Sequence, residues 1–132
     1  MNISFKTVAY WLSYAVYLYI IAPSALSKII QRPAMMQSMQ SLGFDTTWTV
    51  SIGIAETLGV LIVLLGLYAA ACRTLGVLLL FPFAIGAFTT HMAHQEYQHF
   101  YSSLVLCLLS AVLLYLDKRI YIDLSKTLAP VK

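Results

Sequence analysis

Four long apolar stretches, separated by short polar connections, dominate the pattern of this chain. They run over about residues 7–30, 47–71, 74–94 and 97–116. A helix needs about 20 predominantly apolar residues to cross the hydrocarbon core of a bilayer. Each stretch has about that length, so the pattern predicts four transmembrane helices.

A shorter stretch with a different pattern lies between the first and second of these. Over about residues 33–42, methionines and Leu42 recur at helical spacing, while glutamines and serines occupy the opposite side. Pro33 suits the first turn of a helix and Gly43 suits its exit. The pattern predicts a short amphipathic helix at the membrane interface, or one that covers the end of the bundle.

Composition supports the same class of protein. Hydrophobic residues make up 61% of the 132 residues and charged residues only 10%, whereas a soluble domain carries roughly 25% charged residues. Lipid is therefore the expected solvent. We predict an all-α fold, with residues 1–132 forming one membrane domain: a transmembrane four-helix bundle with an interfacial helix between spans one and two. The basic residues are scattered, which argues against nucleic-acid binding.

The distribution of basic residues predicts the orientation in the membrane. Four spans place both termini on one side, and that side holds Lys6, Arg73, Lys118, Arg119, Lys126 and Lys132. The other side holds Lys28 and Arg32. The positive-inside rule then predicts cytoplasmic termini, in the inner or plasma membrane. The first stretch is too long for a signal peptide and lacks a cleavage site, so we expect it to be retained.

One carboxylic acid, Glu56, lies within the second apolar stretch. A glycine lies three residues away on either side, at Gly53 and Gly59. Small residues let a neighbouring helix approach closely, so we expect Glu56 in a contact between helices and not facing lipid. An intramembrane acid indicates a functional site by default. The alternative is a hydrogen-bonding post that fixes how the helices pack.

Two other stretches bring polar groups to the same half of the bundle as Glu56. Lys28 lies near the end of the first stretch, while His91 and His94 end the third. A nearby cation keeps a carboxylate ionised, and a histidine can relay protons near neutral pH. We therefore predict Glu56 and His91 as catalytic residues. The predicted ligand-binding residues are Lys28, Tyr14, Tyr17, His94 and Tyr101.

These assignments have alternatives. Lys28 can extend to lipid headgroups instead of forming an ion pair, and His91 can simply bond a backbone carbonyl. A metal site has suitable ligand types, but its spacing matches no strong motif, so none is predicted; the residues concerned are His91, His94, Glu96 and His99. The two cysteines form no Cys-x-x-Cys pair, so a dithiol redox centre is not supported.

Four short motifs follow one another along the chain. They are Ser24-Ala25-Leu26-Ser27-Lys28-Ile29, Leu42-Gly43, the Gly-x-x-Glu-x-x-Gly run from Gly53 to Gly59, and Thr90-His91. In this order and spacing the chain resembles the DoxX-like family of small four-span membrane proteins over nearly its whole length. That family usually has a glycine shortly before the lysine, where this chain has Ser24 and Ala25. The resemblance implies Glu56, His91 and Lys28 as the positions that carry over.

Relatives in this family look like quinone-linked oxidoreductase subunits, maturation factors of redox enzymes and receptor-assembly chaperones, so the resemblance implies the fold more directly than any single activity. The first hypothesis is a redox-associated membrane protein. In this hypothesis a quinone-like or small polar ligand binds around Glu56, and His91 relays the proton outward. The chain has no haem, flavin or nucleotide motif, so electrons would require a partner redox subunit.

The alternative is an assembly factor or chaperone for another membrane protein, with Glu56 structural. A transporter is least favoured, because four short spans leave little room for alternating access without a second copy of the chain. The pattern does not decide whether the protein is an enzyme.

Overall fold

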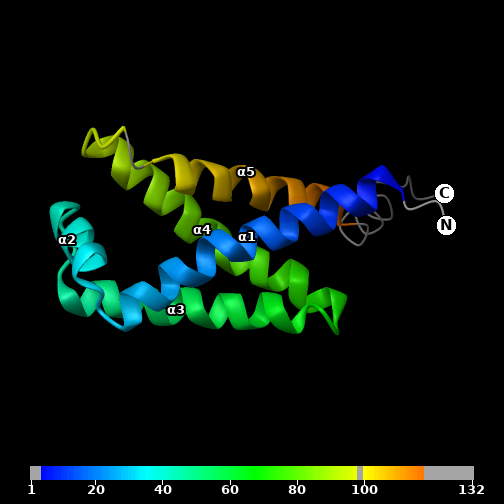
Figure 1. Ribbon diagram of the computed structural model, residues 1–132, viewed down its shortest axis with the longest axis horizontal. Helices are drawn as coiled ribbons and strands as arrows, with labels where there is room; N and C mark the ends of the chain where they lie inside the picture. The colour runs from blue at the N-terminus through cyan, green and yellow to red at the C-terminus, as the bar shows by residue number, and fades with distance from the viewer. Residues whose placement is uncertain (1–3, 98–99, 118–132) are drawn as a thin grey trace, which may run out of the picture.

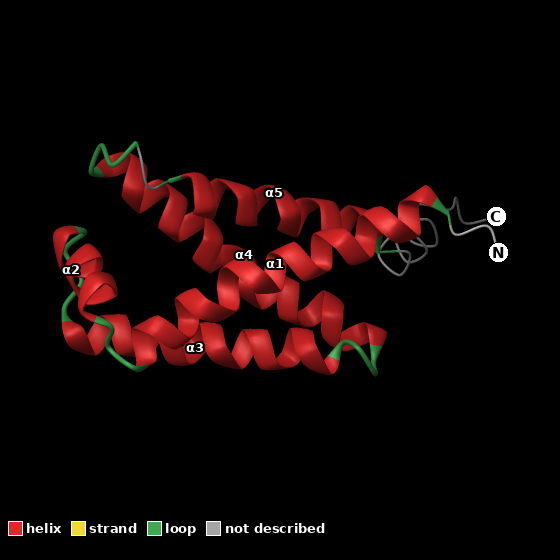
Figure 2. Cartoon of the chain, viewed as in Figure 1, coloured by secondary structure: helices red, strands yellow, loops and turns green. Residues whose placement is uncertain are grey.

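Five α-helices make up the ordered elements of the computed structural model, which describes residues 4–97 and 100–117. In chain order they are α1 (Phe5–Ile29), α2 (Pro33–Ser41), α3 (Thr46–Leu65), α4 (Ala70–Ala93) and α5 (Tyr101–Leu116). Within these residues only helices and connecting loops occur (Figure 2). The predicted all-α fold is confirmed.

The four long helices form a ring in which each packs against two neighbours. Helix α1 contacts α3 and α5, and α4 contacts the same two helices. Helix α1 begins and α5 ends at one end of the molecule, which also holds the α3–α4 turn (Figure 1). Helix α2 and the α4–α5 connection lie at the opposite end. This up-and-down order is the one expected for four spans.

Three of the helices, α1, α3 and α4, are long and apolar enough to cross a membrane. Helix α5 is equally apolar but has 16 residues. At about 1.5 Å per residue it is about 24 Å long, which is shorter than the ~30 Å hydrocarbon core. It begins at Tyr101 and not near residue 97 as the pattern suggested, and the chain turns at Gln95 before it.

The turn between α3 and α4 comes earlier than the sequence pattern suggested. Helix α3 ends at Leu65 and α4 begins at Ala70, whereas the pattern placed the turn around Cys72 and Arg73. A Cβ at Gly66 would lie 2.1 Å from Arg73 Cγ, and Arg73 Nη1 donates to the Gly66 carbonyl at 3.0 Å. Because Gly66 has no side chain, Arg73 can fold over the end of α3 and pair one of its free carbonyls.

Three helices, α1, α2 and α4, end at the α2 end of the molecule in the same way. The residue after each cap has a positive φ: 54° at Gln31, 89° at Gly43 and 58° at Gln95. The next amide then bonds back to the last helical turn, as Glu96 N–H does to the His91 carbonyl at 3.0 Å. This is the Schellman arrangement. The predicted start of α2 at Pro33 and its exit at Gly43 are confirmed.

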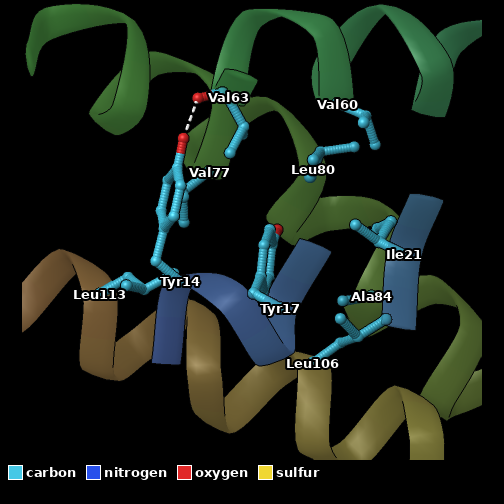
Figure 3. Packing of buried hydrophobic residues seen from close by; sticks show 10 residues of the cluster. All are labelled: Tyr14, Tyr17, Ile21, Val60, Val63, Val77, Leu80, Ala84, Leu106 and Leu113. Atoms are coloured by element: carbon cyan, nitrogen blue, oxygen red, sulfur yellow. Dashed lines mark hydrogen bonds between the residues drawn. The ribbon is translucent and has the colours of Figure 1, made fainter. Parts of the chain in front are cut away.

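The hydrophobic core joins all four long helices around two tyrosines of α1. Tyr14 and Tyr17 point inward from one face of α1 (Figure 3). The Tyr14 hydroxyl donates to the carbonyl of Val63 on α3. Ser110 Oγ on α5 lies 3.5 Å from the Tyr17 hydroxyl. Both hydroxyls therefore find partners inside the bundle, as buried tyrosines require.

The two glycines around Glu56 bring α3 close to different neighbours. A Cβ at Gly53 would lie 2.7 Å from Lys28 Cβ on α1. A Cβ at Gly59 would lie 2.5 Å from Leu80 Cδ2 on α4. Glu56 is thus placed where α3 approaches both helices at short range, as the glycine spacing predicts.

Candidate functional site

A cavity of about 510 Å³ lies between the helices beneath α2. Small-molecule sites commonly have volumes of about 300–1,000 Å³. All five helices contribute to its wall, which is mostly apolar with a few polar groups. The polar lining residues are Ser24, Lys28, Ser38, Glu56, Thr90, His91, Ser102 and Ser103. The apolar part of the wall includes Ile21, Met35, Met39, Phe44, Ile52, Phe83 and Leu106.

A buried ion pair joins α1 to α3 at the wall of this cavity. Lys28 Nζ lies 2.6 Å from Glu56 Oε2 and donates a second hydrogen bond to Ser24 Oγ at 3.1 Å. Lys28 is 7% exposed and Glu56 is 6% exposed. A short, charge-assisted hydrogen bond in these surroundings is stronger than its equivalent in water. Of the two alternatives for Lys28, the structure therefore has the ion pair.

The ion pair keeps part of its hydrogen-bonding capacity. An ammonium has three donors and a carboxylate two oxygens. The described part of the chain supplies Lys28 with two acceptors, at Ser24 and Glu56, and places no donor on Glu56 Oε1. One N–H donor of Lys28 and one oxygen of Glu56 thus have no hydrogen-bond partner among the described residues, and both residues line the cavity.

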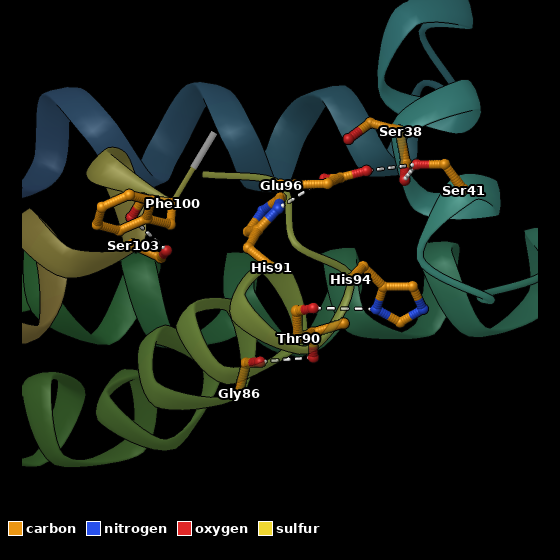
Figure 4. A network of polar contacts seen from close by, with 9 residues as sticks. All are labelled: Ser38, Ser41, Gly86, Thr90, His91, His94, Glu96, Phe100 and Ser103. Carbon is orange, nitrogen blue, oxygen red and sulfur yellow. Dashed lines mark hydrogen bonds and ion pairs between the residues drawn. The ribbon is translucent and has the colours of Figure 1, made fainter. Parts of the chain in front are cut away.

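The α4 side of the cavity carries a second polar group, His91, which is held by Glu96. His91 Nδ1 lies 2.9 Å from Glu96 Oε2 (Figure 4). Ser41 Oγ lies 3.1 Å from Glu96 Oε1 and 2.7 Å from the Ser38 carbonyl, and these two acceptors share its single hydrogen. Ser41 is the last residue of α2. The carboxylate of Glu96 therefore connects the end of α4 to the end of α2. His91 bonds a side chain and not a backbone carbonyl, whereas His94 Nδ1 lies 3.0 Å from the Thr90 carbonyl.

The cavity brings together three of the predicted residues, Lys28, Glu56 and His91. The other four lie elsewhere. Tyr14 and Tyr17 belong to the hydrophobic core. Tyr101 is 61% exposed at the start of α5, and the side chain of His94 is exposed beyond the end of α4.

Two polar residues that hold the site together, Glu96 and Ser41, are absent from the set that the sequence predicts as ligand-binding or catalytic. Glu96 lies five positions after His91, a spacing that places two residues on different faces of a helix. Their contact arises only because the chain reverses at Gln95. Glutamine has no preference for the positive φ that this turn requires, so the sequence does not predict the reversal. Within the described residues, no group of three or more His, Cys, Asp or Glu side chains could hold a metal. His99, part of the alternative metal set, lies outside the described residues.

Comparison with models of protein families matches residues 12–113 to the DoxX-like family. The matched region contains every residue that lines the cavity. Comparisons with curated proteins and with solved structures gave no match.

Proposed function

The chain belongs to the DoxX-like family, and we propose that it binds a quinone-like ligand in the cavity beneath α2 and serves a redox partner in the membrane. The observation that carries the proposal is the Lys28–Glu56 pair, which offers both a donor and an acceptor at the wall of a largely apolar cavity. A quinone headgroup has a matching character, because it combines an apolar ring with oxygens that accept as carbonyls and donate as hydroxyls.

The expected chemistry follows from the side chains of Lys28 and Glu56, together with His91. The free N–H of Lys28 would donate to a ring oxygen, and Glu56 Oε1 would accept a hydroxyl proton from the hydroquinone form. Oxidation of a hydroquinone releases two protons and two electrons. Glu56 would take up one proton and His91 the other, on the side of the cavity nearer the α4–α5 connection. The electrons would pass to a redox subunit of the same membrane.

The test is equilibrium binding of a short-chain ubiquinone, and separately a short-chain menaquinone, to the purified protein in lipid nanodiscs. We expect saturable binding of at least one of them to the wild type. Glu56→Gln should weaken it by about ten- to one-hundredfold, the factor for losing a hydrogen bond to a charged group. His91→Gln should also weaken quinone binding.

His94→Gln is the matched control, because His94 neighbours His91 in sequence but does not line the cavity. It should leave the dissociation constant unchanged. If the wild type binds neither quinone, or if Glu56→Gln and His94→Gln bind equally well, the proposal is wrong.

A second candidate, assembly of another membrane protein, is favoured by one specific observation. Lys28 and Glu56 pair with each other inside the bundle, so Glu56 can stabilise the fold without any ligand. In this function the chain would hold a client protein or a second copy of itself through its membrane-facing surface. Affinity purification from membranes should then recover a defined client whose abundance falls when the chain is deleted. Unchanged abundance of every co-purified protein would exclude it.

A further inference from the structure

One carboxylate, that of Glu96, contacts two parts of the molecule that lie on different sides of the cavity. Its Oε2 is 2.9 Å from His91 Nδ1, and its Oε1 lies 3.1 Å from Ser41 Oγ, whose single hydrogen is shared with the Ser38 carbonyl at 2.7 Å. Figure 4 shows the side chain lying between His91 and the end of α2. Both oxygens are thus engaged at the same time.

The end of α4 explains how Glu96 reaches this position. Gln95 has φ of 58°, and the amide of Glu96 bonds back to the His91 carbonyl at 3.0 Å. The backbone of Glu96 is therefore anchored to the same residue whose ring its side chain holds. This double attachment makes the relative position of Glu96 and His91 a property of the helix end.

Helix α2 is attached to the rest of the molecule unevenly. Its backbone packs against α1 and α3, and within the described residues it has no such packing against α4 or α5. Its side chains Met35 and Met39 nevertheless line the cavity, together with residues of α4 and α5. The hydrogen bond from Ser41 to Glu96 crosses to the α4 side. Release of that bond would free one edge of α2 while its packing on α1 and α3 remains.

We propose that Glu96 is a positioning residue that couples the closure of α2 over the cavity to the orientation of His91. When α2 is closed, Ser41 holds one oxygen of Glu96 and the other receives Nδ1–H of His91. The second ring nitrogen, Nε2, is then left to accept a proton in the cavity, since the bond at one ring nitrogen sets the role of the other. The identity of the proton donor rests on the proposed quinone function, whereas the coupling itself does not.

The first test measures closure without any ligand. Ala87, which lines the cavity on α4, is replaced by cysteine in a background where both native cysteines are alanine. The rate of its reaction with a small charged methanethiosulfonate reagent then reports how often the cavity opens. Ser41→Ala and Glu96→Gln should each raise this rate, by up to about tenfold for one lost hydrogen bond. Ser38→Ala removes a hydroxyl from the same helix and keeps the Ser41–Glu96 bond, so it should not change the rate.

The second test reads the orientation of His91 directly. Replacing His94 and His99 by glutamine leaves His91 as the only histidine, so ¹⁵N labelling of histidine rings gives signals from this residue alone. Wild-type Glu96 should give one dominant form with the proton on Nδ1. Glu96→Ala should shift the ring signals toward a mixture of tautomers, and Ser41→Ala should shift them part of the way.

The outcomes separate this proposal from the quinone function. Equal labelling rates in Ser41→Ala and Ser38→Ala would overturn the closure step. Ring signals that do not respond to Glu96→Ala would overturn the positioning role, and faster labelling in Ser41→Ala without any change in the ring signals would overturn the coupling. Failure to bind a quinone would change none of these readouts.

Discussion

At the residue scale, the Lys28–Glu56 pair carries both a structural and a chemical consequence. Removing either charge leaves the other buried without its counter-ion, which typically costs about 3–5 kcal/mol, whereas replacing both by apolar residues is often neutral. The intact pair therefore adds little to the net free energy of folding, but breaking it on one side is costly. It joins α1 to α3 at the level of the cavity.

We expect Lys28→Met to lower the free energy of unfolding by about 3–5 kcal/mol. The double variant Lys28→Met with Glu56→Leu should recover most of that loss, because no buried charge remains. Lys6→Met, on an exposed position of the same helix, is the control and should change stability by less than about 0.5 kcal/mol. Unfolding in mixed detergent measures all three. A double variant as unstable as Lys28→Met alone would contradict this account.

At the scale of elements, close contacts between helices depend on particular glycines. Gly53 allows α1 to approach α3 beside Lys28, and Gly76 allows α4 to approach Val63 of α3, where a Cβ would lie 2.5 Å from Val63 Cγ2. Gly86 has no heavy atom within 4 Å of the position where its Cβ would stand. The glycines of the helices thus serve different purposes, which sequence spacing alone does not separate.

The contrast predicts opposite effects of the same substitution. Gly53→Ala should destabilise the protein by about 1–3 kcal/mol, because the added methyl group forces α1 and α3 apart. Gly86→Ala should stabilise it by about 0.5–1 kcal/mol, since alanine loses less backbone entropy than glycine within a helix. Thermal unfolding in the same detergent gives both values. Equal effects at the two positions would show that the close approach at Gly53 has no energetic weight.

The helix ends lead to a second prediction at this scale. Gln95 adopts a left-handed conformation with φ of 58°, which costs a residue with a side chain roughly 1–2 kcal/mol. Gln95→Gly should therefore stabilise the protein by roughly 0.5–1 kcal/mol after the entropy of glycine is subtracted. Gln37→Gly, inside α2, is the matched control and should destabilise by a similar amount. If Gln95→Gly and Gln37→Gly both destabilise the protein relative to the wild type, Gln95 is not strained.

The ends of the elements also show which local signals can be read from a sequence. Pro33 and Gly43 have conformational preferences, and each marks a helix boundary as predicted. Asp45 has a capping preference, and in the structure the Trp48 amide donates to its Oδ1 at 2.8 Å. Gln31 and Gln95 have no preference for a left-handed conformation, so the turns they make could not be foreseen. The early end of α3 followed from Arg73 folding over Gly66, a contact between residues on two helices.

At the scale of the whole molecule, the arrangement gives the two ends of the bundle different characters. One end holds the start of α1, the α3–α4 turn and the end of α5, and the other holds α2 and the α4–α5 connection. The cavity belongs to the α2 end. If the positive-inside rule holds here, the cavity opens on the side of the membrane opposite the cytoplasm.

Accessibility of single cysteines in intact cells tests this orientation. In a background without native cysteines, Gln37→Cys on α2 should react with an impermeant maleimide added outside. Tyr68→Cys, at a position 92% exposed in the α3–α4 turn, should react only after the membrane is permeabilised. Labelling in the reverse pattern would show that the termini lie outside.

The sequence by itself determined the class of the protein, the number of long apolar helices and the half of the bundle that holds its polar groups. These features follow from local composition and periodicity, because every backbone group in lipid must be paired within a helix. The spacing of the glycines around Glu56 also predicted its position between helices. Tertiary structure decided what those groups do to one another: that Lys28 pairs with Glu56, that Tyr14 and Tyr17 belong to the core, and that Glu96 joins α2 to His91. Such contacts depend on where chain reversals and close approaches set distant residues side by side, and a one-dimensional pattern does not contain those distances.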